Sequence, residues 1–198
     1  MPIIDTILER RSQPIVEGAI DAAALETIFR CALTAPDHKR IRPWRYIVCN
    51  DEHKAALKQL ILSTLPPHAD AAERAQQVER KLGFAPHIVI CALEFNRRCG
   101  VPDIEQILSA GASIQNMIVA AEALGCKCYW KTGEWAYNPS LRDRLGLGRD
   151  AVITGFLGLG RRAGAGCSAR QVERPALDAH FRLMDAPVPQ AQDCVQMH

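Results

Sequence analysis

The sequence has no hydrophobic run that approaches the roughly 20 residues needed to cross a bilayer, which argues against a membrane-spanning helix. Its first residues, Met1 to Asp5, lack the basic segment and the long apolar core of a secretory signal peptide. The formal net charge is only +2, so global charge does not indicate attraction to nucleic acid or to an anionic membrane. We therefore expect a cytoplasmic protein that binds neither nucleic acid nor membrane.

No C-x-x-C motif or nearby Cys/His cluster completes a tetrahedral metal site, although the chain has eight cysteines. Without a secretory signal, a disulfide framework is not expected, and free cysteines in apolar segments behave as small buried hydrophobes. Cys126 and Cys128 are the one close pair, and alternate residues of a strand share a face. We expect no metal, but a thiol- or metal-sensing protein that uses this pair remains an alternative.

The length of 198 residues is sufficient for one domain with its own core. An apolar fraction of 48% and a charged fraction of 23% are ordinary for a soluble globular protein. Hydrophobic periodicity is lost after Gly160, where the sequence becomes rich in Gly, Arg and Ala. We expect a single domain over residues 1–198, of which about 161–198 form an extended C-terminal arm.

Hydrophobic periodicity and capping signals predict alternating helices and strands, and hence one domain of mixed helix and sheet. The predicted helices are 3–10, 21–33, 53–65, 69–82, 102–124 and 138–146, and the predicted strands are 45–49, 87–93, 126–130 and 151–159. The run from His87 to Leu93 is apolar throughout, which is typical of a strand buried on both faces. Gly155, Gly158 and Gly160 are expected to keep the surface of the last strand open.

Arg10, Arg11 and Ser12 stand side by side at the end of the first predicted helix. Each guanidinium offers a planar fork of donors that matches phosphate oxygens, and the hydroxyl adds a short neutral donor. This pattern indicates a compact phosphate clamp. The alternative is that the two cations simply complete a helix C-terminus, which is a common and modest stabilising feature.

A polar, cationic loop covers residues 35–42 and is closed by Pro43 and Trp44. Together with the arginine pair, it suggests a pocket for a phosphorylated, planar cofactor. His38 is adjacent to Asp37, so an ion pair between them competes with a role in binding. Trp44 is expected to lie in the core under the loop.

Five motifs occur in a characteristic order along the chain. They are Arg10-Arg11-Ser12, the segment 35–44, Ser109-Ala110-Gly111-Ala112, Trp130-Lys131-Thr132-Gly133 after Gly125, and Gly155 to Gly160. The set resembles the FMN-dependent nitroreductase family, in particular its small YdjA-like branch, over about residues 3–160.

The resemblance implies an α+β nitroreductase-like fold in which helices flank a central mixed sheet. It further implies an intertwined homodimer with FMN bound at the subunit interface. The implied reaction is ping-pong: NADH or NADPH reduces the flavin and leaves, and an electron-poor small molecule such as a nitro compound then takes its place.

The resemblance also assigns roles to individual residues. The arginine pair and Ser12 would hold the phosphate and ribityl chain, His38 would reach the flavin of the partner subunit, and the segment 130–132 would lie along the isoalloxazine ring. Lys131 is the candidate for tuning the flavin, because a nearby cation stabilises the charge of the reduced ring; the alternative is a surface lysine. No side chain is expected to be catalytic by itself. The expected cofactor-binding residues are Arg10, Arg11, Ser12, His38, Trp130, Lys131 and Thr132.

Three charged residues in the loop, Asp37, Arg40 and Arg42, depart from the pattern common in the wider family. The acceptor therefore stays open, and a flavin-dependent reductase or dehydrogenase of a non-nitro substrate is an alternative. The choice between NADH and NADPH is open as well, because no ribose-reading residue can be assigned.

Overall fold

The computed structural model describes residues 3–13, 17–67, 69–161 and 175–183. The chain divides into two compact units, Met1–Cys167 and Ser168–His198. The first unit contains the sheet and the helices around it. The described part of the second unit includes one short 3-10 turn, Leu177–Ala179. The single domain over residues 1–198 with an arm from about residue 161 stays a prediction.

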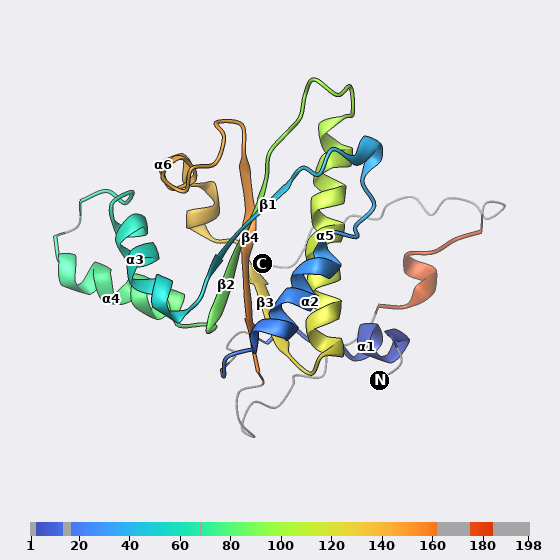
Figure 1. Cartoon of the computed structure of the whole chain (residues 1–198), viewed down its shortest axis with the longest axis horizontal. Coiled ribbons are helices and arrows are strands. Elements are labelled where there is room, and N and C mark those ends of the chain that lie inside the picture. The colour runs from blue at the N-terminus through green and yellow to red at the C-terminus, as the bar shows by residue number, and fades with distance from the viewer. Residues whose placement is uncertain (1–2, 14–16, 68, 162–174, 184–198) are drawn as a thin grey trace. The chain divides into compact units, whose positions relative to one another are not determined.

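The helices and strands of the first unit follow the predicted order along the chain (Figure 1). The helices are α1 (Ile3–Glu9), α2 (Ala22–Ala32), α3 (Lys54–Leu62), α4 (Ala71–Leu82), α5 (Asp103–Ala123) and α6 (Pro139–Arg144). The strands are β1 (Trp44–Cys49), β2 (His87–Leu93), β3 (Lys127–Lys131) and β4 (Val152–Gly160). Short 3-10 turns cover His38–Arg40, Asp51–His53 and Glu134–Tyr137.

Capping residues explain several helix ends. Asp21 accepts a hydrogen bond from the backbone N–H of Ala24 at 2.9 Å and begins α2 as predicted. Asn138 caps α6 in the same way, with Pro139 at the first helical position. The prediction for α3 was too long at its end: the helix stops at Leu62, three residues before Leu65.

The sheet has the strand order β1-β2-β4-β3, and every pair of neighbours is antiparallel. The expectation of a mixed sheet is therefore wrong for the described strands. The crossover helix α5 joins β2 to β3, which run in the same direction. Strand β4 lies between them and runs the opposite way, so no parallel pair forms.

Helices cover both faces of the sheet in the first unit. Figure 1 shows α3, α4 and α6 on one face and α2 and α5 on the other. Strand β2 is buried along its whole length, as its apolar sequence predicts. Its side chains alternate between the two faces: Ile88 and Ile90 pack toward α3 and α4, and Val89 and Cys91 pack toward α2 and α5.

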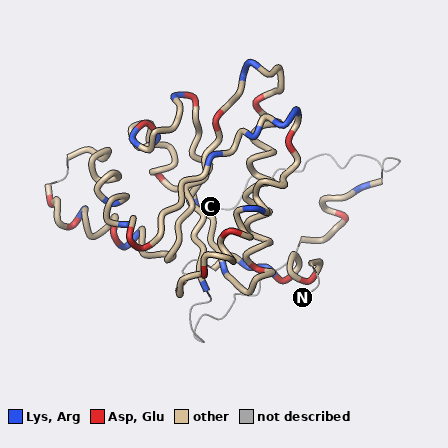
Figure 2. The backbone as a smooth tube through the Cα atoms, viewed as in Figure 1, with Lys and Arg blue, Asp and Glu red and all other residues tan. Residues whose placement is uncertain are grey.

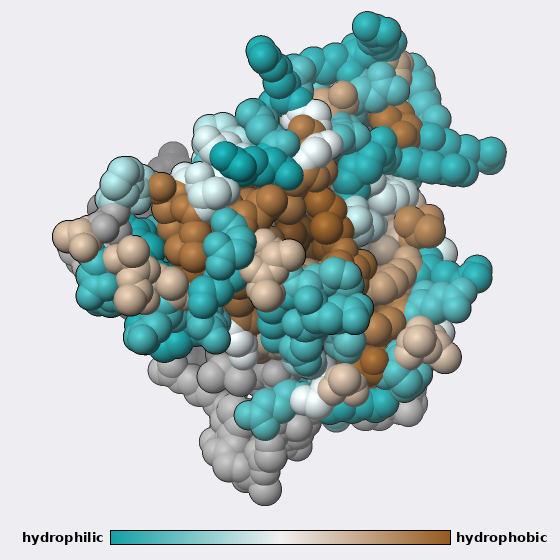
Figure 3. All heavy atoms as spheres, turned by 60° about the vertical axis from the view of Figure 1, so that its left-hand side comes forward, coloured by the Kyte–Doolittle hydropathy of each residue, from teal (hydrophilic) through white to brown (hydrophobic). Residues whose placement is uncertain are grey.

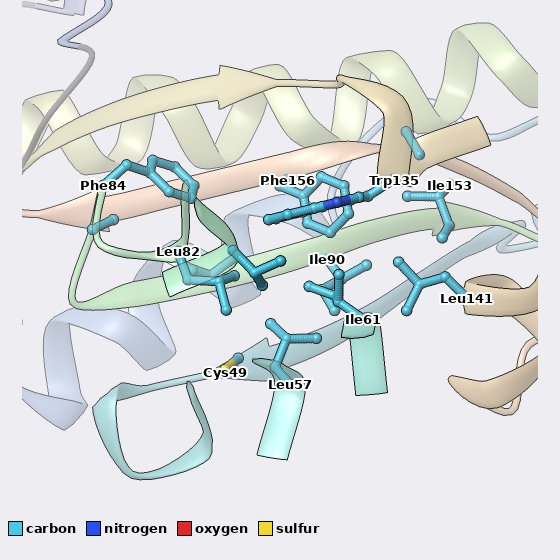
Figure 4. Packing of buried hydrophobic residues seen from close by; sticks show 14 residues of the cluster. Cys49, Leu57, Ile61, Leu82, Phe84, Ile90, Trp135, Leu141, Ile153 and Phe156 are labelled. Atoms are coloured by element: carbon cyan, nitrogen blue, oxygen red, sulfur yellow. The ribbon is translucent and has the colours of Figure 1, made fainter. Parts of the chain in front are cut away.

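Large apolar side chains fill the core on the α3–α4 face (Figure 4). The ring of Trp135 meets Phe156 edge to face, with 6.1 Å between the ring centroids. Ile61 and Leu141 enter this cluster from α3 and α6 and are fully buried. Burial of these side chains fixes both helices on the sheet.

Two serines of α5 bond to the backbone of α2 and of the segment after it, beside the larger apolar side chains on the α2–α5 face of the sheet. Ser113 of α5 donates a hydrogen bond to the carbonyl oxygen of Ala32 in α2 at 2.6 Å. Ser109 likewise donates to the carbonyl of Pro36 at 2.8 Å. The small residues of α5 therefore permit close helix packing, which is the simplest explanation of their abundance.

The glycines of β4 do not keep its surface open, so that expectation is wrong. A Cβ atom on Gly158 would lie 2.3 Å from the ring of Phe84 and 2.8 Å from Ala85. A Cβ atom on Gly155 would lie 2.4 Å from Nε1 of Trp130. Both positions are glycine because neighbouring side chains occupy the space that a Cβ would need.

Charged residues of both signs are spread over the elements of the first unit (Figure 2). Viewed from the α3–α4 side, the surface is mostly polar but shows an apolar band between polar regions (Figure 3). In the part of the chain that the structure describes, no helix combines the length and apolar character needed to cross a membrane.

His87 makes stability depend on pH. The side chain is 8% exposed, and its Nε2 accepts a hydrogen bond from the backbone N–H of Ile20 at 3.0 Å. Burial lowers the pKa of His87 below the ordinary value of 6.5. The unfolded chain therefore binds the proton more readily, and stability is lost as pH falls below about 6.5. We expect the free energy of unfolding, measured by urea unfolding, to fall between pH 7.5 and 5.5. In His87→Gln, this loss should be smaller; an unchanged pH dependence would contradict the assignment.

Candidate cofactor site on the edge strand

The segment from Arg10 to Gln13 lies beside β3, which is an edge strand of the described sheet. The backbone N–H of Arg10 donates to the carbonyl oxygen of Thr6 at 3.0 Å and extends the hydrogen bonding of α1. Three residues later, the N–H of Gln13 donates to the carbonyl oxygen of Cys128 at 3.1 Å. These two bonds fix both ends of the segment, so the arginine pair and Ser12 are positioned next to β3.

Among the described residues, the two guanidiniums make only local contacts. Arg11 donates to the carbonyl oxygens of Leu8 at 3.1 Å and of Arg10 at 2.9 Å. Arg10 lies 3.4 Å from the hydroxyl of Ser12. The bond to Leu8 is the helix-end contact that the alternative explanation predicts. These contacts use a small part of the five N–H donors on each guanidinium. Both side chains therefore retain N–H groups for an anion.

Gln13 was missed by the sequence analysis. Its Nε2 is buried and has no acceptor among the described residues. An unpaired buried amide costs free energy, and such a group is commonly completed by a ligand or a water molecule. Its position directly after Ser12 was the available signal, but burial of an amide cannot be read from one sequence.

The end of β3 forms an open cavity of about 520 Å³, lined by residues 129–133. Trp130 is 41% exposed, and its indole N–H donates to the carbonyl oxygen of Thr154 at 3.2 Å. Because Trp130 is held from β4 over Gly155, its ring has a fixed orientation and still presents surface to solvent. Thr132 is exposed at the same cavity. Residues rise by about 3.3 Å along a strand, so Trp130 lies roughly 7 Å along β3 from the point where Gln13 is bonded.

Lys131 points to the opposite face of the sheet from Trp130. Its Nζ donates to the carbonyl oxygen of Lys81 at 3.0 Å and lies 3.6 Å from the centroid of the Phe84 ring. Burial, with a smaller contribution from the charge of Lys81, lowers the pKa of Lys131 to about 8. Lys131 is thus half-buried: the residue lines the cavity, while its ammonium lies against Phe84 and the Lys81 carbonyl.

His38 lies outside this group of residues. Its Nδ1 is 2.6 Å from a carboxylate oxygen of Glu105 in the first turn of α5. The ion pair with Asp37 that was considered from the sequence does not form; Asp37 instead accepts a hydrogen bond from the backbone N–H of Arg42 at 2.6 Å. Trp44 is buried, as predicted.

Cys126 and Cys128 are both buried in the cluster between the sheet and α5. Burial raises the pKa of Cys126 and raises that of Cys128 to about 12. A reactive or metal-binding thiol needs a thiolate, which these surroundings disfavour. Among the residues that the structure describes, no group of three or more His, Cys, Asp or Glu side chains could hold a metal ion.

Comparison with known proteins agrees with this geometry. Residues 17–161 match the Nitroreductase family. The chain belongs to this family. Among curated relatives, the Escherichia coli K12 protein named Putative NAD(P)H nitroreductase YdjA is 31% identical over 166 residues, which cover 81% of this chain and 88% of that protein. The resemblance to the YdjA-like branch is therefore confirmed.

Solved structures of the Nitroreductase family share the fold. A nitroreductase-like family protein from Bacillus cereus aligns with a TM-score of 0.79 and 23% identity, over 94% of this chain and 97% of that one. A nitroreductase from Desulfovibrio desulfuricans in complex with FMN aligns with a TM-score of 0.68 and 23% identity, over 96% and 99%. The Nitroreductase match begins at Glu17 and does not include Arg10 to Gln13. A cofactor-binding role for these residues therefore has to be argued from their position beside β3.

Proposed function

We propose that this chain is an FMN-dependent oxidoreductase that takes a hydride from NADH or NADPH and reduces an electron-poor acceptor such as a nitro compound. The observation that carries the proposal is the cationic, donor-rich segment Arg10–Gln13 fixed beside the cavity at the end of β3. The family membership and the nitroreductase name of the E. coli relative support the same activity.

The donor set beside β3 fits the phosphate end of FMN. Two guanidiniums and one hydroxyl supply bidentate and single donors for phosphate oxygens. The buried Nε2 of Gln13 lacks a partner within the described residues, and an oxygen of a bound cofactor would complete it. Arg10, Arg11 and Ser12 would bind the phosphate and ribityl chain, with Gln13 as a further donor.

Trp130 and its neighbours fit the ring end of the cofactor. The indole offers an apolar face whose orientation is fixed by the bond to the Thr154 carbonyl, and Thr132 adds a hydroxyl at the same cavity. When bound, FMN accepts a hydride from the nicotinamide and gives it to the acceptor. The protein groups bind and orient the partners; none of them needs to form a covalent bond. The FMN in the D. desulfuricans relative supports this choice of cofactor.

We expect a ping-pong order, in which donor and acceptor share one cavity. The cavity of about 520 Å³ opens to solvent, so donor and acceptor would bind to it in turn. We expect anaerobic NADPH or NADH to bleach the flavin absorbance, and a nitroaromatic acceptor to restore it after the oxidised dinucleotide has left. Steady-state rates should give parallel double-reciprocal lines. Intersecting lines, or bleaching that requires the acceptor, would contradict the ping-pong order. Rates with nitro and with enone acceptors distinguish a nitroreductase from a flavin-dependent reductase of a non-nitro substrate.

A homodimer is the second part of the proposal, and exposed apolar side chains on two helices support it. Ile104, Ile107 and Leu108 form an exposed apolar face of α5. Exposed isoleucines and a leucine also cover α1, which is unusual for a monomer. In such a dimer, His38 would reach the FMN site of the partner subunit.

The dimer is tested by changing the exposed face of α5. We expect the wild-type protein to sediment at twice its chain mass of 21.8 kDa. The Ile104→Asp/Leu108→Asp variant should sediment as a monomer, because two carboxylates would be buried in an apolar interface. A wild-type monomer would contradict the proposal, and so would a variant that remains dimeric.

Lys131 is proposed to tune the potential of the bound flavin. Its pKa of about 8 leaves the ammonium charged at neutral pH, on a residue that lines the cavity. We expect Lys131→Met to lower the flavin midpoint potential, because the positive charge stabilises the anionic reduced ring. Lys127→Met is a matched control, since this lysine is on the same strand but pairs with Glu122. A potential that is unchanged in Lys131→Met would remove this role.

A further inference from the structure

A second cleft, separate from the cavity at the end of β3, lies where β1 begins, β2 ends and β4 begins. It has a volume of about 420 Å³, which is within the usual range for a small-molecule site. Its lining includes four arginines and two carboxylates: Arg42, Arg45, Arg97, Arg98, Glu94 and Asp150. Figure 2 shows Lys and Arg on both the 38–42 loop and the loop after β2. The charges of the lining sum to about +2, so the cleft favours anions.

Two of the arginines form ion pairs with the carboxylates of the cleft. Arg45 pairs with Glu94 at 2.8 Å and donates to the carbonyl oxygens of Arg42 and Trp44. Arg97 pairs with Asp150 at 3.2 Å and also lies 5.2 Å from the ring of Phe95. These contacts use both carboxylates of the cleft and connect its three loops.

The other two arginines have no partner for their guanidiniums among the described residues. Arg42 and Arg98 are both exposed at the cleft. The backbone of Arg98 is fixed by the side chain of Asn96, whose oxygen accepts its N–H at 3.2 Å. Two unpaired guanidiniums on ordered backbone are therefore available to one ligand.

Backbone strain around Arg42 indicates that its position is imposed by the surroundings. Lys39, Arg40 and Arg42 all have positive φ angles, 57°, 54° and 53°. Residues with a Cβ adopt this region at a cost and persist in it where other contacts hold them. The carboxylate of Asp37 holds the N–H of Arg42, and Lys39 donates to the carbonyl of Cys99 at 3.0 Å across the two loops.

We propose that this cleft binds the phosphate group of a small organic phosphate, with Arg42 and Arg98 as its ligands. Guanidiniums bind phosphate oxygens through paired N–H donors. Arg45 and Arg97 already pair with Glu94 and Asp150, so the carboxylates of the cleft are neutralised and Arg42 and Arg98 remain for the ligand. The 2′-phosphate of NADPH is one source of this group, and a phosphorylated acceptor is another. The first source connects the cleft to the proposed oxidoreductase function; the anion site itself does not depend on that function.

Direct titration tests the site. Calorimetry with inorganic phosphate and with adenosine 2′-phosphate is carried out on FMN-saturated protein and on Arg10→Ala/Arg11→Ala protein. Arg42→Ala/Arg98→Ala should weaken phosphate binding by about tenfold or more. Arg80→Ala, on exposed α4, is the matched control and should bind as the wild type does. Alanine keeps the Cβ at position 42, so the backbone strain is the same in the variant. Absence of phosphate binding, or equal binding by the wild type and the double variant, overturns the proposal.

Coenzyme kinetics distinguish the two sources of phosphate. If the double variant loses kcat/KM for NADPH about tenfold and keeps that for NADH, the cleft reads the 2′-phosphate. If both coenzymes are unaffected while phosphate binding is lost, the cleft serves a different organic phosphate. If the proposed oxidoreductase function is wrong, the purified protein will contain no FMN. The calorimetric titration with phosphate would still test the cleft.

Discussion

The variant Arg10→Ala/Arg11→Ala is expected to purify with little or no FMN and to bind added FMN about 10²- to 10⁴-fold more weakly. Each charged hydrogen bond to phosphate contributes roughly 1.5–3 kcal/mol, and two such side chains are removed. The apo fold should be nearly unaffected, because within the described part of the chain the two guanidiniums bond only to Leu8, Arg10 and Ser12. The measurements are the FMN-to-protein ratio and the dissociation constant from flavin fluorescence.

Two controls make this result specific to the phosphate clamp. Arg30→Ala removes an exposed arginine on α2 that pairs with Glu26, and it should leave FMN binding unchanged. Gln13→Ala should weaken FMN binding by a smaller factor, because it removes one neutral donor. Wild-type affinity in Arg10→Ala/Arg11→Ala would show that the clamp beside β3 does not hold the cofactor.

Gly155→Ala is expected to destabilise the protein by about 3 kcal/mol, from overpacking together with a strained backbone. The added Cβ would lie 2.7 Å from the carbonyl oxygen of Lys131 and 2.4 Å from the indole nitrogen of Trp130. The φ angle of Gly155 is 143°, which a residue with a Cβ rarely adopts. Because Trp130 must move, FMN binding should weaken together with stability. Urea unfolding and flavin titration measure the two effects.

Gly148→Ala is the matched control for this change. It lies in the loop before the same strand, and its Cβ would be 3.7 Å from a carboxylate oxygen of Glu94, an ordinary contact. Its stability should stay within about 0.5 kcal/mol of the wild type. If Gly155→Ala were as stable as Gly148→Ala, the close packing of Trp130 over β4 would not exist in solution.

Local signals in the sequence predicted most of the elements. A side chain that caps its own helix, such as Asp21, acts within a few residues and can be recognised from the chain alone. The apolar run His87–Leu93 likewise determines its own burial, and the structure confirms both ends of the strand. The motif Arg10-Arg11-Ser12 and the segment Trp130–Thr132 lie on neighbouring pieces of chain, connected by the bond from Gln13 to Cys128.

The failures involve contacts between residues that are distant in sequence. His38 pairs with Glu105, 67 positions away, and no local pattern distinguishes this partner from the adjacent Asp37. The space above Gly155 is filled by Trp130 from another strand, so a glycine that suggested an open surface marks close packing instead. The direction of neighbouring strands also depends on which strands become adjacent: β4 lies between β2 and β3, so the described sheet is antiparallel and not mixed.

The central claim is that this chain carries FMN, and the visible spectrum of the purified protein tests it most directly. We predict flavin absorption bands and release of FMN, identified by mass, after heat denaturation. A colourless protein that also fails to take up added FMN would contradict the account.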